Sequence, residues 1–155
     1  MVEALADMFV AAQAPQISWE GQPAYAIYEI APIPSSVIVE FLYARQSPAQ
    51  GLTLKVNGGM LAVDGIEASE MLLWRDTAPS KVTVRLTSEA GKRATLKLWN
   101  IWRGSIGGVD VTQAWLGNAG MRVDQSEDRR ELLVCCSDGE GLVDFGNLEF
   151  RVTLV

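Results

Sequence analysis

Apolar and polar residues alternate most regularly between positions 81 and 104. Every second residue from Val82 to Leu86 is apolar, with charged or hydroxylated residues between them. This period of two is typical of a half-buried strand. Charged residues around Gly91 predict a turn. Alternation resumes from Leu96 to Trp102, apart from Asn100, so the whole segment predicts a β-hairpin.

Short apolar or alternating stretches recur along the rest of the chain. They are rich in β-branched and aromatic residues, which favour strands, and glycine and proline mark the turns between them. The predicted strands outside the first hairpin are 16–19, 24–31, 36–43, 52–56, 60–63, 71–75, 121–123, 132–136 and 148–154. The Asn57-Gly58-Gly59 sequence between two of them is typical of a hairpin turn.

Three further segments have patterns of their own. In the strand at 36–43, alternation places Phe41 and Tyr43 on the same face. Residues 65–70 are compatible with a helical turn. Residues 109–115 have a weak helical pattern.

The first fourteen residues differ from the rest, because their apolar side chains recur at helical spacing. Successive members of the set are three or four positions apart: Val2, Leu5, Phe9 and Ala12. This spacing predicts a short amphipathic helix within residues 1–14 that ends before Pro15.

The same segment does not have the pattern of a secretory signal. It has no basic start, and Glu3 and Asp7 interrupt its apolar run. No stretch of about 18 apolar residues occurs in the chain, so no transmembrane helix is predicted. We therefore expect a cytoplasmic protein without a membrane partner.

The predicted elements together indicate the fold class. About nine to eleven short strands separated by turns, with no long helical period and no internal repeat, are typical of an all-β antiparallel sandwich or jelly roll. A closed barrel is the alternative. At 155 residues we expect a single domain over 1–155, with the helix in 1–14 and the sandwich over 16–155.

Composition excludes several functions. The formal charge is -6, with 13 basic and 19 acidic residues, which argues against binding to nucleic acids or anionic membranes. The chain has no histidine, so histidine-dependent nucleophilic triads and histidine zinc sites are excluded. An enzyme would have to use carboxylates, lysine, tyrosine or a bound metal, and we expect a non-enzymatic protein.

The two cysteines are adjacent, at Cys135 and Cys136. Neighbouring residues in a strand point to opposite faces, and a disulfide between them would strain the backbone. Two reduced, buried thiols are the favoured interpretation, and a redox or soft-metal pair is the alternative.

Five tryptophans in the chain provide flat aromatic surfaces that can serve as core or as ligand platforms. In the strand that ends the first hairpin, alternation places Trp102 in the core and Trp99 outward, on the same face as Lys97 and Arg103. Packing beneath the N-terminal helix or another subunit is the common role for such a residue. Ligand binding is the alternative.

Trp74, Arg75 and Asp76 follow one another at a predicted strand end. An arginine–aspartate pair can clamp a polar ligand through charge-assisted hydrogen bonds. Fixing the turn is the favoured interpretation of this pair.

An acidic glycine-containing loop holds Asp138, Glu140 and Asp144. Carboxylates separated by glycines can supply oxygen ligands to calcium, although the spacing does not fit an EF-hand loop. A solvated turn is the favoured interpretation, and a structural calcium site is the alternative.

The end of the chain resembles a known group of sandwiches. An acidic loop, then Asp144-Phe145 and a closing strand from Leu148 to Val155, are similar to galactose-binding-domain-like sandwiches and carbohydrate-binding modules. The resemblance covers about a tenth of the chain. It implies a structural calcium near the termini and sugar binding through loops at one end of the sandwich.

These observations lead to two expectations about function. In the first, the protein is a non-enzymatic carbohydrate-binding module, in which a sugar ring stacks on aromatic side chains and its hydroxyls bond to charged ones. The residues assigned to this site are Trp99, Trp74, Arg103, Lys97 and Asp76. In the second, the protein is structural, and the same aromatic face is a homo-oligomer interface.

Overall fold

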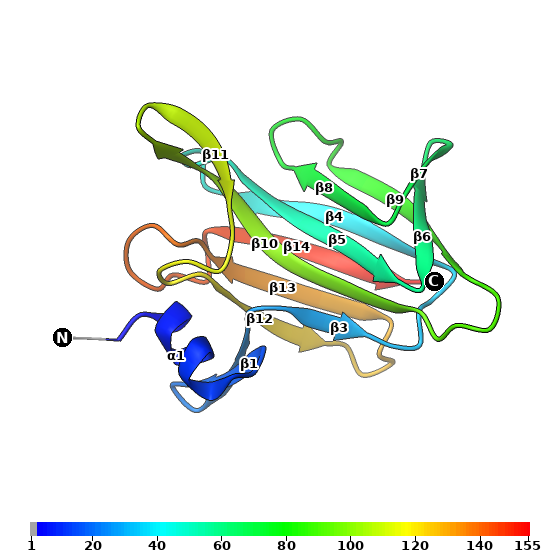
Figure 1. Ribbon diagram of the computed structural model, residues 1–155, viewed down its shortest axis with the longest axis horizontal. Coiled ribbons are helices and arrows are strands. Elements are labelled where there is room, and N and C mark those ends of the chain that lie inside the picture. Colours follow the sequence, from blue (N-terminus) through cyan, green and yellow to red (C-terminus); the bar gives the residue numbers. More distant parts are fainter. Residues whose placement is uncertain (1–2) are drawn as a thin grey trace.

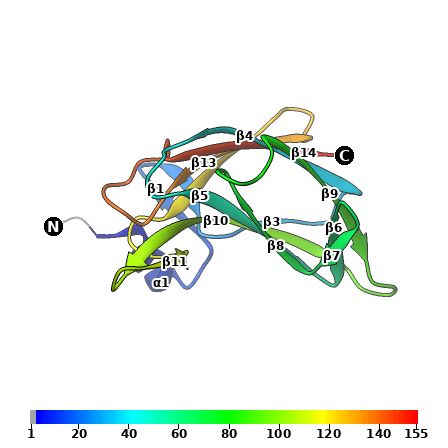
Figure 2. The ribbon, with the colours of Figure 1, turned by 90° about the horizontal axis from the view of Figure 1, so that it is seen from above.

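Two antiparallel β-sheets face each other in the computed structural model, which describes residues 3–155 (Figures 1 and 2). The predicted all-β antiparallel sandwich with a short N-terminal helix is confirmed. The described residues form fourteen strands, more than the nine to eleven expected. They are β1 (Gln16–Trp19), β2 (Gln22–Tyr25), β3 (Tyr28–Ile30), β4 (Ser36–Ala44), β5 (Gln50–Asn57), β6 (Gly59–Val63), β7 (Ile66–Ala68), β8 (Glu70–Trp74), β9 (Lys81–Ser88), β10 (Thr95–Ile106), β11 (Val109–Gln113), β12 (Gly120–Gln125), β13 (Glu131–Ser137) and β14 (Leu148–Leu154).

The larger sheet has nine strands in the order β1-β2-β12-β13-β14-β4-β9-β6-β7. The smaller sheet has the order β11-β10-β5-β8, and β3 also pairs with β10. One edge of β10 is shared, because β3 pairs with Leu96–Leu98 and β11 pairs with Trp102–Ile106. At the C-terminal end of β10, β10 and β11 project from the sheet as a two-stranded ribbon (Figure 1).

The predicted hairpin between residues 81 and 104 is wrong. Both strands form, but β9 pairs with β4 and β6 in the larger sheet, whereas β10 pairs with β5 in the smaller one. The turn around Gly91 therefore carries the chain from one layer to the other. Alternating residues identify the buried face of each strand, but they do not identify the strand that it pairs with.

The turn at Asn57-Gly58-Gly59 crosses between the sheets in the same way. β5 belongs to the smaller sheet and β6 to the larger one, so the hairpin expected from this sequence does not form. Gly58 has a φ of 78°, a left-handed conformation that glycine adopts without steric cost.

Two of the additional strands replace elements that the sequence pattern suggested were helical. Residues 66–68 form β7 and residues 109–113 form β11. β11 is exposed on both faces except at its last residue, so it has no buried face whose side chains would alternate regularly.

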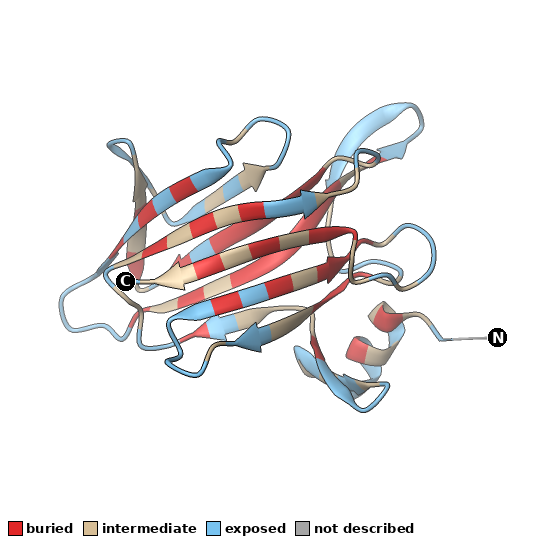
Figure 3. Cartoon of the chain, turned by 180° about the vertical axis from the view of Figure 1, so that it is seen from behind, coloured by how far each residue is buried: buried red, intermediate tan, exposed pale blue. Residues whose placement is uncertain are grey.

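The main core lies between the sheets and follows the predicted alternation. In β4, Val37, Val39 and Phe41 point inward, and in β9 every second residue from Val82 to Leu86 does so. Figure 3 shows the resulting stripes of buried and exposed residues across the larger sheet. Burial of these side chains supplies the main favourable contribution to folding.

A β-bulge changes the face on which Tyr43 lies. Phe41 pairs with Phe150, but Tyr43 pairs with Glu149, so Leu42 is an extra residue in β4. An extra residue reverses the alternation beyond it. Tyr43 is therefore exposed while Phe41 is buried, contrary to the single face predicted for both.

A second, smaller core holds the N-terminal helix α1 (Leu5–Ala12). Leu5 and Phe9 of this helix pack with Ala24 of β2, which confirms an amphipathic helix with apolar residues four positions apart. Residues 1 and 2, at the start of the predicted 1–14 segment, lie outside the described residues. No helix in the part of the chain from residue 3 onward is long and apolar enough to cross a membrane.

Candidate functional site

The outer face of the smaller sheet carries the residues that the sequence pattern singled out, and Trp99 lies at its centre. Trp99 is only 8% exposed, so it is not the open platform that alternation suggested. Trp115 covers it, with ring centroids 5.0 Å apart and the planes tilted by 40°. Trp99 lies on the outer face of β10 as predicted, but it lacks the open face that stacking of a sugar ring requires.

Trp115 is held over Trp99 by a hydrogen bond from its side chain. Its indole Nε1 donates a hydrogen bond to the carbonyl oxygen of Ala26 at 3.0 Å. The cover of Trp99 thus comes from the segment after β11, and the N-terminal helix packs elsewhere, against Ala24. Trp102, on the opposite face of β10, is 1% exposed, which confirms its predicted core position.

Trp74, Arg103 and Asp76 form a cluster at one end of this outer face. The guanidinium carbon of Arg103 lies 4.3 Å from the ring centroid of Trp74, a distance typical of a cation–π contact. Arg103 Nη1 also donates to Asp76 Oδ2 at 2.8 Å. Three of the predicted site residues are therefore brought together.

The indole of Trp74 packs against the sheet next to Gly51 of β5. A Cβ atom at position 51 would lie 2.9 Å from Trp74 Cε3, so only glycine leaves room for the ring. Arg103 also lies over the indole, so Trp74 does not offer a free stacking face. The predicted stacking of a sugar ring on Trp74 is not supported by this geometry.

Asp76 pairs with Arg103 and not with its neighbour Arg75. The turn between them is fixed by the backbone, because the amide nitrogens of Thr77 and Ala78 donate to the carbonyl oxygen of Trp74 at 3.2 and 2.8 Å. The favoured interpretation of an Arg75–Asp76 pair as the lock of this turn is therefore wrong.

Lys97 lies apart from the cluster. It is six residues from Arg103 along β10, which places the two about 20 Å apart along the strand. Its cross-strand neighbours are Glu29 of β3 and Lys55 of β5. The predicted site thus divides, and Lys97 does not belong with Trp74, Arg103 and Asp76.

A pocket of about 510 Å³ lies beside the cluster, between the end of β4, the start of β5 and the turn after β8. This volume is within the range of about 300–1,000 Å³ that is usual for small-molecule sites. Its lining residues are Leu42, Tyr43, Ala44, Arg45, Gln46, Ala49, Gln50, Arg75 and Asp76. Asp76 belongs to both the cluster and the pocket, so the two form one continuous polar site.

Strand pairing explains why the pocket is open. β9 pairs with β4 only from Ser36 to Glu40, which leaves the last residues of β4 without a neighbouring strand on that side. The bulge at Leu42 then turns Tyr43 out of the core. The result is an opening at one end of the sandwich, with a tyrosine at its wall.

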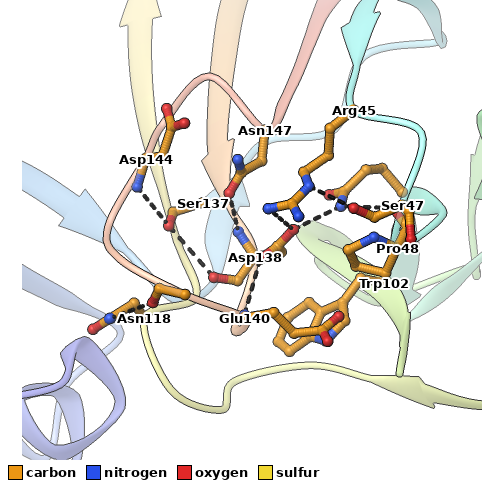
Figure 4. Close-up of polar contacts among 12 residues, drawn as sticks. Arg45, Ser47, Pro48, Trp102, Asn118, Ser137, Asp138, Glu140, Asp144 and Asn147 are labelled. Atoms are coloured by element: carbon orange, nitrogen blue, oxygen red, sulfur yellow. Dashed lines mark hydrogen bonds and ion pairs between the residues drawn. The ribbon is translucent and has the colours of Figure 1, made fainter. Parts of the chain in front are cut away.

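A buried carboxylate lies behind the pocket. The side chain of Asp138 is 0% exposed, and its Oδ2 accepts a hydrogen bond from Gln50 Nε2 at 2.8 Å. Its Oδ1 accepts from the amide of Glu140 at 2.9 Å. Arg45 Nη1 lies 3.5 Å from Asp138 Oδ2, and Figure 4 shows Arg45 pointing toward this carboxylate.

The amide of Gln50 has one orientation that its neighbours permit. Its Nε2 donates to the Pro48 carbonyl oxygen at 3.1 Å and to Asp138 Oδ2, and both partners are acceptors only. The other atom of the amide, Oε1, therefore takes part in neither of these hydrogen bonds. It is buried and has no hydrogen-bond partner within residues 3–155, which is costly unless a ligand or water donates to it.

The three acidic residues proposed for calcium do not converge. Asp138 faces Gln50, whereas Asp144 Oδ1 accepts from the amide of Gly146 at 2.8 Å. Figure 4 shows the carboxylate of Asp144 directed away from Asp138, and Glu140 on another side. No group of three or more acidic or thiol side chains in the described part of the chain is arranged to hold a metal ion.

A second pocket of similar size, about 540 Å³, lies at the opposite end of β10. Its cations are Lys92 and Arg93, and Lys92 is already paired with Glu89 at 2.7 Å. It contains no aromatic side chain and no buried polar group without a partner among the described residues. The pocket at Tyr43 and Arg75 is therefore the better candidate site.

The adjacent cysteines are free thiols on opposite faces of β13, as predicted, but only Cys136 is fully buried. Burial, followed by the nearby charges of Glu149 and Asp124, raises the pKa of Cys135 to about 11. Burial also raises the pKa of Cys136 well above its usual value. Neither thiol is therefore prepared as a nucleophile at neutral pH.

The sequence pattern did not indicate Tyr43, Arg45 or Gln50 as site residues. The sequence pattern does not reveal the bulge in β4, so it does not predict that Tyr43 is exposed. Arg45 and Gln50 lie in or beside the loop between β4 and β5, which has no recognisable motif. Their relation to Arg75 and Asp138 depends on contacts between segments far apart in the chain, which no local spacing reveals.

No protein-family model, curated protein or solved structure matches this chain.

Proposed function

We propose that this protein is a non-enzymatic β-sandwich module that binds carbohydrate in the pocket between β4 and β8. The observation that carries the proposal is the convergence of Tyr43, Gln50, Arg75 and Asp76 on one pocket at the end of the sandwich. This combination of an aromatic ring with donors and acceptors is what hydroxyl-rich ligands require.

Each lining residue has a role in this proposal. The ring of Tyr43, which is 53% exposed, provides the apolar surface for the less polar face of a sugar. Asp76 accepts hydrogen bonds from hydroxyl groups, and Arg75 donates to ring and hydroxyl oxygens. The role first assigned to Trp99 and Trp74 passes to Tyr43, because the two tryptophans are covered by Trp115 and Arg103.

The resemblance to galactose-binding-domain-like sandwiches supports the same proposal at a general level. Sugar binding through loops at one end of the sandwich is what that resemblance implies, and the pocket lies at such an end. We assign no metal to the site, because the acidic residues of the loop after β13 point in different directions.

The test is a saccharide array with the full chain, followed by calorimetric titration of the best ligand. We expect Tyr43→Ala to weaken binding at least tenfold while leaving the thermal midpoint nearly unchanged. Ile106→Ala is the control, since Ile106 is also an exposed apolar side chain, at 61%, but lies outside this pocket. No binding to any saccharide would remove the proposal.

A second candidate is a structural role through self-association. The observation that favours it is the exposure of Leu72 at 44% and Trp115 at 46%. In this proposal these side chains form the contact between two copies. Light scattering over a range of concentrations tests it: an oligomer that Leu72→Lys disrupts supports self-association, and a monomer at all concentrations contradicts it.

A further inference from the structure

We propose that the pocket between β4 and β8 selects acidic saccharides, in which a carboxylate accompanies the hydroxyl groups of the sugar. This inference rests on the proposed function, because it names the class of carbohydrate that the same site takes. Two observations support it, one about the charges in the pocket and one about a buried amide oxygen.

The first observation is that Arg75 is a cation without an internal partner. Of the pocket's other charged groups, Arg45 lies 3.5 Å from Asp138, and Asp76 pairs with Arg103 at 2.8 Å. Within residues 3–155, Arg75 forms no ion pair, and its side chain makes no hydrogen bond. Its guanidinium is therefore free to form two parallel hydrogen bonds with a carboxylate.

The charge around the pocket has the sign that an acidic ligand needs. The charged side chains that line it are two cations and one anion: Arg45, Arg75 and Asp76. The protein as a whole carries a formal charge of -6. A locally positive pocket attracts an anionic ligand even in a protein of net negative charge.

The second observation is the unpartnered Oε1 of Gln50. This oxygen needs a hydrogen-bond donor, and Gln50 lines the same pocket as Arg75. A carboxylate cannot donate to it, but a sugar hydroxyl can. Gln50 is 1% exposed and its Nε2 bonds to Pro48 and Asp138, so Oε1 is a buried acceptor of a pocket-lining residue that a ligand hydroxyl would satisfy.

Together the two groups distinguish the classes of ligand. An anion without a hydroxyl group satisfies Arg75 but leaves Gln50 Oε1 without a donor. A neutral saccharide supplies the donor but leaves the guanidinium of Arg75 without an anion. A uronic acid residue supplies both from one ring, and its less polar face can lie against Tyr43.

The experiment is calorimetric titration of the full chain with trisaccharides of galacturonate, glucuronate or mannuronate. The neutral counterpart of each trisaccharide and inorganic phosphate are titrated in parallel. We expect at least one uronate to bind at least tenfold more tightly than its neutral counterpart. Raising the salt concentration from 50 to 500 mM should weaken that binding severalfold, because it screens the contact with Arg75.

Substitutions at Arg75 sharpen the test. We expect Arg75→Gln to remove the preference for the uronate, and Arg75→Lys to retain part of it, because lysine keeps the charge but loses the fork geometry. Arg93→Gln, an equal change of charge at the opposite end of β10, is the control and should leave binding unchanged.

The outcomes separate this inference from the proposed function. Neutral saccharides that bind as tightly as uronates, with no effect of Arg75→Gln, would overturn the inference and leave carbohydrate binding intact. Absence of binding to every saccharide would overturn both. Binding of phosphate alone would also overturn both, since it would show that the pocket binds anions without recognising a sugar.

Discussion

Trp115 shields Trp99 from solvent, with the two ring centroids 5.0 Å apart. The pair joins the segment after β11 to the middle of β10, and it turns the aromatic face predicted for ligand binding into packed structure. Trp99 is 8% exposed while Trp115 is 46% exposed, so Trp115 is the outer member of the pair.

The first prediction concerns this pair. We expect Trp115→Ala to expose Trp99 and to lower the free energy of unfolding by about 1 to 2 kcal/mol, because it removes an aromatic contact and its buried area. Denaturant unfolding measures the loss, and acrylamide quenching of tryptophan fluorescence reports the exposure. Trp115→Phe should retain most of the stability. Equal quenching of Trp115→Ala and a Trp115→Ala/Trp99→Phe double variant would contradict the proposed shielding.

The second prediction concerns the buried carboxylate of Asp138. We expect Asp138→Ala to destabilise the fold by about 3 kcal/mol, because it leaves the Nε2 of Gln50 and the amide of Glu140 without their acceptor. Asp144→Ala is the comparison, since its carboxylate accepts from a single exposed amide. Thermal and denaturant unfolding measure both, and equal losses would argue against the central role of Asp138.

A third prediction concerns Gly139, which passes closely beneath Trp102. A Cβ atom there would lie 2.6 Å from the carbonyl oxygen of Leu116 and would also overlap the indole ring. We expect Gly139→Ala to cost about 2 kcal/mol or more through overpacking. At Gly146 the nearest atom is Asp144 Oδ1 at 3.1 Å, so Gly146→Ala should change stability by less than about 0.5 kcal/mol.

The fourth prediction follows from the thiol pKa values. Burial raises the pKa of Cys135 to about 11, so its thiolate is scarce at pH 8 and alkylation of the native protein should be about 100-fold slower than in the unfolded chain. Because the folded pKa lies above the unfolded one, this thiol stabilises the fold fully below pH 9 and progressively less toward pH 11. Rapid alkylation of Cys135 in the native state at pH 7 would contradict this.

The fifth prediction concerns the exposed pair of Arg103 and Asp76. Half-exposed ion pairs contribute little to stability, so we expect Asp76→Asn to change the free energy of unfolding by less than about 1 kcal/mol. It should nevertheless weaken binding of neutral saccharides, because Asp76 also lines the pocket and accepts from their hydroxyl groups. Denaturant unfolding and calorimetric titration separate the two effects. A large loss of stability would instead make Asp76 a structural residue.

Much of the fold could be predicted from local pattern, but much of the site could not. The inward residues of β4 and β9 followed their alternation, and the helix at the N-terminus followed its four-residue spacing. Trp74, Asp76 and Arg103 were found because each lies beside a recognisable strand or turn. Gln50 and Tyr43 were missed, because their importance depends on Asp138 and on a bulge in β4.

Local sequence pattern was enough to identify most strand segments and most core-facing residues, and the composition shows that no histidine chemistry is available. These properties depend on residue type and on spacing within a few positions. Tertiary structure decided that β9 and β10 lie in different sheets, that Trp115 covers Trp99, and that Arg75 shares a pocket with Gln50. Each of these depends on which distant backbone edges and side chains meet, and the period of a single strand does not specify its partner.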